Sequence, residues 1–175
     1  MQEKITKTER VFDGVLVKLD VHDVVLPDGA TSKREVIQHP GACAVIALDG
    51  DDVLLVKQFR IAAQKMMLEL PAGTLEPDED PVACATRELQ EETGYKPLDL
   101  TAMGGFYNAA GYTTEYIHLF KAEKLVESRL EGDSDEFIEV VRIPFEHALT
   151  MIETGEITDS KTIIGVLRVA SNRKS

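Results

Sequence analysis

Short apolar segments separated by turn residues dominate the first sixty positions. Residues 15–25 and 33–38 are rich in β-branched side chains, and residues 26–29 (Leu-Pro-Asp-Gly) supply turn chemistry between them, a pattern typical of a β-hairpin. Two further strands are expected at residues 41–48 and 53–59. Their nearly continuous apolar character indicates strands that are covered on both faces.

Beyond position 71 the apolar residues recur at the spacing of a helix. Asp80 is a suitable N-cap for a helix that begins at Pro81. Gly94 is placed to end this helix in the left-handed conformation. The pattern therefore predicts a helix over residues 81–93, and it is the best-defined element of the sequence.

Strands are expected again at residues 98–107, 116–121 and 137–143. Pro144 begins a further helix that ends near residue 153, and a last helix begins at Asp159 or Ser160. No internal repeat or low-complexity linker interrupts this order. We therefore expect one domain over residues 1–175, of the α/β class, with a mixed sheet covered by helices.

Composition and charge narrow the class of protein. The chain has 175 residues, 43% of them apolar, a size that suits one core. Its 31 acidic and 19 basic residues give a net charge of -12, which disfavours nucleic-acid binding because phosphate backbones are held by a surplus of Lys and Arg. No membrane span or signal peptide is recognisable, so we expect a cytoplasmic protein. Cys43 and Cys84 lie in apolar segments and are expected to be reduced, buried thiols.

Three carboxylates lie in the last turns of the expected helix. Glu88, Glu91 and Glu92 face the negative end of the helix macrodipole, and Glu88 repels both of the others across i,i+3 and i,i+4 spacings. Arg87 can relieve part of this repulsion through an i,i+4 pair with Glu91. Because Mg²⁺ takes carboxylate oxygens and shares its other positions with substrate phosphates, the cluster is a candidate Mg²⁺ site. The alternative is a solvated acidic helix face.

A longer pattern surrounds these glutamates. The chain reads Gly73-x5-Glu79-x7-Arg87-Glu88-Leu89-x-Glu91-Glu92-x-Gly94-Tyr95. It thereby resembles the Nudix hydrolases, whose signature (the Nudix box) is matched at every fixed position, although Tyr95 stands where the family usually has an aliphatic residue. The resemblance implies a Nudix α/β/α sandwich with a mixed central sheet and additional N-terminal antiparallel strands.

The resemblance also implies a reaction. Nudix hydrolases use Mg²⁺ or Mn²⁺ to hydrolyse the pyrophosphate of a nucleoside diphosphate that is linked to another group. The metal ligands implied for this sequence are Glu88, Glu91, Glu92 and the backbone carbonyl of Ala72. Glu79 and Arg87 resemble residues that orient the ligands, so Arg87 joins Glu92 among the expected catalytic residues.

Beyond the box, nearly the whole chain resembles the ADP-ribose pyrophosphatase branch. The matching segments are Lys33-Arg34-Glu35-Val36, Gly41-Ala42, Val56-Lys57-Gln58-Phe59-Arg60 and Glu69-Leu70-Pro71-Ala72-Gly73. In that branch the N-terminal strands, here residues 1–38, form a homodimer, and the remainder, here residues 39–175, is the catalytic core.

The branch also implies the substrate contacts, which on this sequence are Arg34, Glu35, Arg60, Thr74 and Glu115. The counterparts of Arg34 and Glu35 contact the adenosine part of the substrate. The counterpart of Arg60 contacts phosphate, which suits the fork of an arginine. The alternative for Arg34 and Glu35 is an exposed cross-strand charge pair.

The base that deprotonates the attacking water is expected outside the helix, where the branch carries it on a loop before a late strand. Glu136 is the closest counterpart in this sequence. Asp133 and Asp135 lie within a few residues of it and remain alternatives. A flexible acidic loop without an active role is the remaining interpretation.

One loop departs from the branch and leaves the substrate open. Ala110 replaces the proline that marks ADP-ribose preference, and Tyr112 has counterparts in dinucleoside polyphosphate hydrolases. The expected reaction is the Mg²⁺-dependent hydrolysis of ADP-ribose, a small-molecule nucleotide, to AMP and ribose 5-phosphate, without nucleic-acid or membrane partners. The alternatives are another nucleoside diphosphate sugar, a dinucleoside polyphosphate, or a non-catalytic module that senses a nucleotide.

Overall fold

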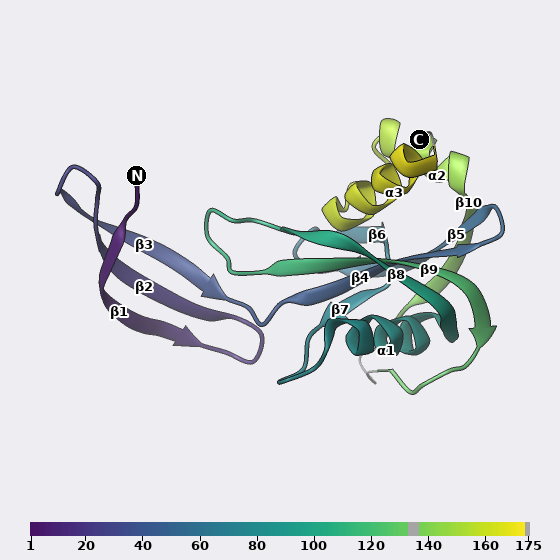
Figure 1. Ribbon diagram of the computed structural model, residues 1–175, viewed down its shortest axis with the longest axis horizontal. Helices are drawn as coiled ribbons and strands as arrows, with labels where there is room; N and C mark the ends of the chain where they lie inside the picture. The colour runs from purple at the N-terminus through teal and green to yellow at the C-terminus, as the bar shows by residue number, and fades with distance from the viewer. Residues whose placement is uncertain (133–136, 174–175) are drawn as a thin grey trace. The chain divides into compact units, whose positions relative to one another are not determined.

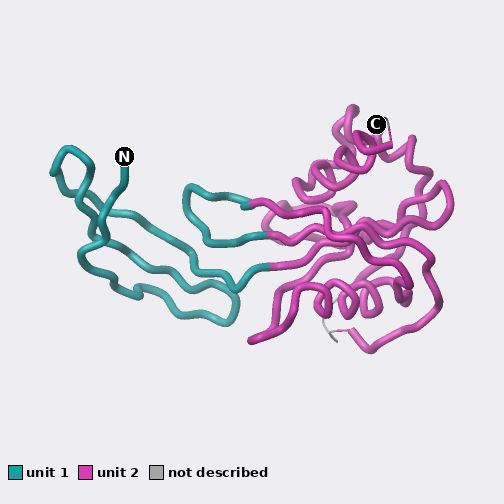
Figure 2. The backbone as a smooth tube through the Cα atoms, viewed as in Figure 1, with its two compact units in different colours: residues 1–41, 107–116 teal, residues 42–106, 117–175 magenta. Residues whose placement is uncertain are grey.

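The computed structural model describes residues 1–132 and 137–173. Contacts between Cα atoms divide the chain into two compact units (Figure 2). Unit 1 comprises residues 1–41 and 107–116, and unit 2 comprises residues 42–106 and 117–175. Each unit has its own sheet and is described by itself below.

Unit 1 is built on a three-stranded antiparallel sheet. Its strands are β1 (Lys4–Asp13), β2 (Lys18–Val25) and β3 (Thr31–Gln38), in this order. The predicted hairpin is confirmed, since β2 pairs with β3 along the full length of both strands. Gly29 lies in the connecting turn with φ +87°, a conformation that glycine adopts without strain.

Unit 2 contains a mixed sheet of seven strands, with the main order β10-β5-β4-β9-β8. The bounds of these strands are β4 (Ala42–Asp49), β5 (Asp52–Arg60), β8 (Tyr95–Tyr107), β9 (Tyr116–Glu127) and β10 (Glu139–Pro144). Two short strands complete the sheet, β6 (Lys65–Glu69) against β5 and β7 (Ala72–Thr74) against β4. The sheet is mixed because β4 is parallel to β9 and antiparallel to β5.

Helices cover both faces of this sheet (Figure 1). Helix α1 (Pro81–Thr93) packs on one face, and α2 (Phe145–Glu153) and α3 (Ser160–Arg173) pack on the other. Alternate residues of β4 enter the two cores: Ala44 and Ile46 join the cluster of α2 and α3, whereas Cys43 and Val45 join the cluster of α1. The predicted α/β/α sandwich with a mixed sheet and additional N-terminal strands is confirmed.

Helix α3 approaches the sheet closely at a glycine. A Cβ at Gly165 would lie 2.7 Å from Leu70 Cδ1 and 2.9 Å from Ile46 Cδ1. Both of these side chains are buried in the core. The absence of a side chain at Gly165 therefore lets α3 lie against the chain segment that enters β7.

Several boundaries differ from the sequence prediction. β6 and β7 were not expected, because segments of five and three residues carry too little periodicity to identify a strand. β8 begins at Tyr95, directly after the helix cap, and β10 begins at Glu139 instead of position 137. Cys43 and Cys84 are free and buried, as predicted. Within the described ranges, no helix is both long and apolar enough to cross a membrane.

Candidate active site

The predicted cap residues hold α1 at both ends. The Asp80 carboxylate accepts hydrogen bonds from the backbone N–H groups of Val82 at 2.9 Å and Ala83 at 3.4 Å. Gly94 takes φ +80°, and its N–H donates to the carbonyl of Gln90 at 3.0 Å. One face of the helix is buried in the α1 core. The side chains of the box are therefore carried on a helix that is fixed at both ends and along one face.

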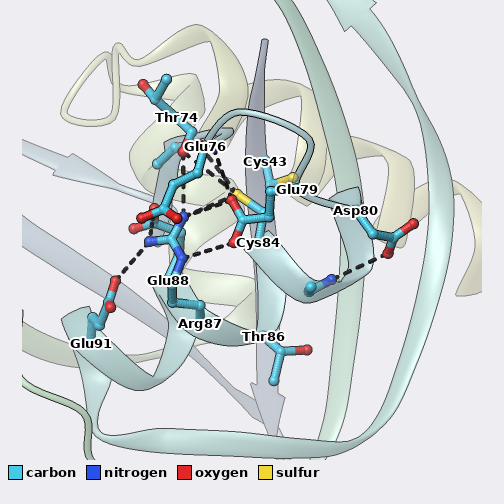
Figure 3. A network of polar contacts seen from close by, with 12 residues as sticks. Cys43, Thr74, Glu76, Glu79, Asp80, Cys84, Thr86, Arg87, Glu88 and Glu91 are labelled. Carbon is cyan, nitrogen blue, oxygen red and sulfur yellow. Dashed lines mark hydrogen bonds and ion pairs between the residues drawn. The ribbon is translucent and has the colours of Figure 1, made fainter. Parts of the chain in front are cut away.

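Arg87 connects three of the predicted acidic residues (Figure 3). Its Nε and Nη2 donate to Oε1 and Oε2 of Glu79 at 2.9 and 3.0 Å, a bidentate pair. Its Nη1 donates to Oε1 of Glu88 at 2.7 Å and to Oε2 of Glu91 at 2.9 Å. The predicted i,i+4 pair between Arg87 and Glu91 is confirmed. One guanidinium therefore sets the positions of three carboxylates.

The bidentate pair also determines the charge of Glu79. The hydrogen bond from Arg87 lowers the pKa of Glu79 to about 2 and outweighs the opposite effect of burial. The pKa of Arg87 is raised, mainly by its hydrogen bond to Glu79. Because a carboxylate with so low a pKa is a weak base, Glu79 is suited to orient Arg87 and unsuited to accept a proton from water at neutral pH.

Glu92 and Glu88 meet the backbone of β7. Oε2 of Glu92 accepts a hydrogen bond from the N–H of Ala72 at 2.9 Å, and Glu92 is 7% exposed. A Cβ at Gly73 would collide with the carboxylate of Glu88. The glycine of the box is thus required for the close approach of Glu88 to the backbone. The structure brings Ala72, Glu88 and Glu92 together at the junction of β7 and α1.

The donor atoms at this junction suit a hard divalent cation. Carboxylate and carbonyl oxygens are the ligands that Mg²⁺ takes in proteins, and the predicted ligands Glu88, Glu91, Glu92 and Ala72 carry groups of this kind. Among the described residues, no three His, Cys, Asp or Glu side chains are grouped as a metal site. Glu88 and Glu91 instead accept hydrogen bonds from Nη1 of Arg87, so a cation would share these carboxylates with the guanidinium.

The two cysteines lie beside this network. Sγ of Cys84 is 3.7 Å from Nη2 of Arg87, and Sγ of Cys43 donates to the carbonyl of Pro81 at 3.2 Å. Hydrogen bonding with Cys43, together with burial, raises the pKa of the Cys84 thiol. The raised pKa favours the protonated thiol, which is less reactive than the thiolate, and Cys84 is buried in the α1 core.

Arg60, the expected phosphate contact, is paired with a buried acid of unit 2. Its Nε and Nη2 donate to Oε1 and Oε2 of Glu69 at 2.7 and 2.8 Å. The ammonium of Lys161 on α3 also donates to Oε2 of Glu69. Lys161 in turn donates to Oδ1 of Asp159 at 3.0 Å. This network joins the ends of β5 and β6 to the beginning of α3.

Two of the remaining substrate positions lie on β3 in unit 1. Nη2 of Arg34 donates to Oε1 of Glu3 at 2.5 Å. Glu3 directly precedes β1, so Arg34 is paired with an acid from outside β3. Glu35 follows on the same strand and is paired in register with Val21 of β2. Thr74 lies on β7, and its carbonyl accepts a hydrogen bond from Nη2 of Arg87 at 3.4 Å.

Glu115 lies in the loop between β8 and β9 that belongs to unit 1. Its Oε2 accepts a hydrogen bond from Nδ2 of Asn108 at 2.9 Å, and its Oε1 is 4.0 Å from Nε2 of His39. The same loop is joined to the end of β3, because the N–H of Ile37 donates to the carbonyl of Tyr112 at 2.8 Å. Glu115 is therefore held by neighbours within unit 1.

The expected base lies beyond what the structure describes, since Glu136 and its alternatives Asp133 and Asp135 fall outside the described residues. Sequence reasoning also missed Lys161 as part of a site. Its segment showed only the signals of a helix start, and its partner Glu69 is 92 positions away in the chain. No local pattern joins two such residues.

The ionised state of Glu69 predicts a loss of stability in acid. Burial by itself would raise the pKa of Glu69, but the hydrogen bonds and charges of Arg60 and Lys161 outweigh it, and the pKa is lowered. The stabilisation is therefore complete above the unfolded-state pKa of about 4.3 and decreases as the pH falls through the folded-state pKa. We expect Glu69→Gln to be less stable than the wild type at pH 7 by about 1–3 kcal/mol.

This difference is measured by urea unfolding from pH 7 to pH 3. It should shrink below about pH 4, where the unfolded chain begins to protonate Glu69 while the folded protein still holds this carboxylate ionised. Glu153→Gln, a change at an exposed helix end, is the matched control. A difference that stays constant over the whole range would contradict the lowered pKa.

Known proteins are similar to this chain in sequence and in fold. The NUDIX domain model matches residues 37–164. ADP-ribose pyrophosphatase of Bacillus subtilis (strain 168) is 43% identical over 169 residues, which cover 95% of this chain and 91% of that protein. The methanol dehydrogenase activator of Bacillus methanolicus is 44% identical over 168 residues, which cover 94% and 91%. GDP-mannose pyrophosphatase of Shigella flexneri serotype 5b (strain 8401) is 36% identical over 156 residues, which cover 82% and 81%.

A solved structure agrees with the fold. The crystal structure of an ADP compounds hydrolase matches with a TM-score of 0.91 at 23% sequence identity, and the match covers 99% of this chain and 95% of that one. The family model covers most of the chain and includes the complete box from Gly73 to Tyr95. The chain therefore belongs to the Nudix family, and the prediction of a Nudix pyrophosphohydrolase is confirmed.

Proposed function

We propose that this Nudix enzyme hydrolyses ADP-ribose to AMP and ribose 5-phosphate. The observation that carries the proposal is the arrangement of the box, in which Arg87 holds three carboxylates while Glu92 is held by the backbone of β7. The choice of substrate is supported by the 43% identity to a protein named ADP-ribose pyrophosphatase. The 36% identity to a GDP-mannose pyrophosphatase supports the wider class of nucleoside diphosphate-linked substrates.

Different side chains have different roles in the proposed reaction. Glu88, Glu91, Glu92 and the carbonyl of Ala72 would hold Mg²⁺, with Mn²⁺ as the alternative. A divalent cation there neutralises the pyrophosphate charge and lowers the pKa of bound water. Arg87 holds the carboxylates in place, and the low pKa of Glu79 keeps this pair charged.

Hydrolysis requires one bond to form and one to break. The water oxygen bonds to a phosphorus of the pyrophosphate, and the bond from that phosphorus to the bridging oxygen breaks. The proton of the water passes to the base, for which we propose Glu136. The proposed substrate contacts are Arg34, Glu35, Arg60, Thr74 and Glu115, with Arg60 on phosphate.

The first test compares substrates and a box variant. Phosphate release after phosphatase treatment is measured with Mg²⁺ for ADP-ribose, GDP-mannose, diadenosine polyphosphates and NADH. We expect the highest kcat/KM for ADP-ribose. Glu92→Gln should reduce kcat by about 100-fold or more, because losing a ligand or its orienting shell typically costs 10- to 100-fold and the base step depends on the same site.

Glu76→Gln is the matched control, since Glu76 lies between β7 and α1, within the span of the box but outside its fixed positions. Its kcat should equal that of the wild type. Preference for another compound would overturn ADP-ribose as the substrate and retain the reaction. Unchanged turnover in Glu92→Gln would overturn the assignment of the metal ligands.

A second candidate function follows from the 44% identity to a methanol dehydrogenase activator. That relative covers as much of the chain as the ADP-ribose pyrophosphatase does. If this chain shares the function, adding it with Mg²⁺ to a methanol dehydrogenase should raise the rate of methanol oxidation. Glu92→Gln should abolish the increase if activation requires hydrolysis, and a wild-type chain without any effect would exclude this candidate.

We also propose that the enzyme is a homodimer formed through residues 1–38. The supporting observation is a group of large apolar side chains in this segment of unit 1 that are half or more exposed, namely Ile5, Val11, Phe12, Val15 and Leu16. Large apolar side chains left exposed in one segment are typical of interaction sites.

Sedimentation should give about twice the chain mass of 19.3 kDa. Phe12→Asp should shift the mass toward the monomer, because it places a charge within the apolar group. Leu98→Asp, a change at an exposed apolar side chain of β8 in unit 2, is the matched control and should leave the mass unchanged. A monomeric wild type would contradict the proposal.

A further inference from the structure

Glu69 is compensated by two cations that come from different elements of unit 2. Arg60 at the end of β5 makes a bidentate pair with it, at 2.7 and 2.8 Å. Lys161, in the first turn of α3, donates to Oε2 of the same carboxylate. Glu69 itself is 2% exposed. One buried negative charge therefore has two positive partners.

The two cations differ in how firmly they are held. The Lys161 side chain is 13% exposed, and Asp159 holds it at 3.0 Å. Asp159 also caps α3, since its Oδ2 accepts hydrogen bonds from the N–H and the hydroxyl of Thr162 at 2.9 and 2.6 Å. The hydroxyl of Thr162 in turn accepts a hydrogen bond from the N–H of Leu70 at 2.8 Å, next to Glu69. Lys161 thus belongs to a rigid corner between α3 and β6.

Arg60 is the accessible partner. Its side chain is 41% exposed, and the described residues provide no hydrogen bond to its Nη1. The pKa of Arg60 is raised mainly by its hydrogen bond to Glu69, and the charge of Glu92 adds to this effect. Arg60 therefore lies within electrostatic range of Glu92, and its side chain is partly open to solvent.

A second partner for Glu69 is required if Arg60 is to bind a phosphate. Turning the guanidinium toward a phosphate breaks one or both of its bonds to Glu69. A carboxylate as buried as Glu69 cannot take water in exchange, and a buried charge without a partner is strongly unfavourable. The cost is avoided only when another cation stays on the carboxylate.

We propose that Lys161 is a positioning residue for substrate binding: it keeps Glu69 compensated and thereby allows Arg60 to leave Glu69 for the phosphate of the substrate. The inference rests on the proposed function, in which Arg60 contacts phosphate. It adds a residue outside the Nudix box that controls the availability of this arginine.

The test measures ADP-ribose binding without turnover, by calorimetry in the presence of a metal chelator. In Lys161→Met, Arg60 is the one cation among the described residues that is still bonded to Glu69, and it stays on it, so the Kd should rise about tenfold, the value of one lost charge-assisted hydrogen bond. Lys161→Arg retains a cation and should bind like the wild type. Lys65→Met is the matched control, because Lys65 donates to Thr158 at 2.9 Å near the same corner.

A second substitution separates positioning from a structural role. In Lys161→Met/Glu69→Gln the charge that retains Arg60 is removed, so affinity for ADP-ribose should return to within about threefold of the wild type. A purely structural role of Lys161 predicts the opposite, a further loss when Glu69 is also changed. Thermal unfolding by circular dichroism shows that each variant is folded at the temperature of the assay.

The outcomes distinguish this inference from the proposed function. If the wild type binds and cleaves ADP-ribose and Arg60→Ala binds it more weakly, the proposed function is supported. This result does not by itself support the role of Lys161. In that case an unchanged Kd in Lys161→Met, or a loss that Glu69→Gln does not reverse, overturns the role of Lys161. If the wild type does not bind ADP-ribose, or Arg60→Ala binds it as the wild type does, the role of Lys161 is overturned because its premise has failed.

Discussion

The candidate active site depends on one guanidinium. Arg87 collects Glu79, Glu88 and Glu91, three carboxylates that would otherwise repel one another at the end of a helix. Removing it would take this compensating positive charge away from three partly buried carboxylates. The same bonds give each carboxylate a defined orientation, which is what a metal site requires of the residues around it. The acidic cluster is thus compatible with folding because Arg87 is present.

The rest of unit 2 supplies the frame for this interaction. Alternation along β4 divides the interior into a core that anchors α1 and a core that anchors α3. The segment from Glu69 to Gly73 passes between them, with Glu69 bonded to Lys161 of α3 and Ala72 bonded to Glu92 of α1. Residues of both helices therefore form hydrogen bonds with the short segment that leads into the box.

The names of the relatives indicate how much the fold and the box determine about function. Proteins that share 36–44% of their residues with this chain carry the names of an ADP-ribose pyrophosphatase, a GDP-mannose pyrophosphatase and a methanol dehydrogenase activator. The reaction class follows from the box, whereas the choice of substrate depends on residues outside it. In this chain the loop that carries the proposed substrate contact Glu115 has Ala110 in place of the proline of the ADP-ribose branch.

The sequence by itself determined the helix of the box with both caps, the pair between Arg87 and Glu91, the hairpin of β2 and β3, and the α/β class, because each depends on spacing within one segment. It did not reveal β6 or β7, which are too short to show a period, nor the solvent-exposed strand β1 as a separate element, since its residues are exposed on both faces. Only the tertiary structure decided that Arg60 and Lys161 share Glu69. Charges that lie far apart in the chain become partners only when the packing of α3 on the sheet places them around one buried carboxylate.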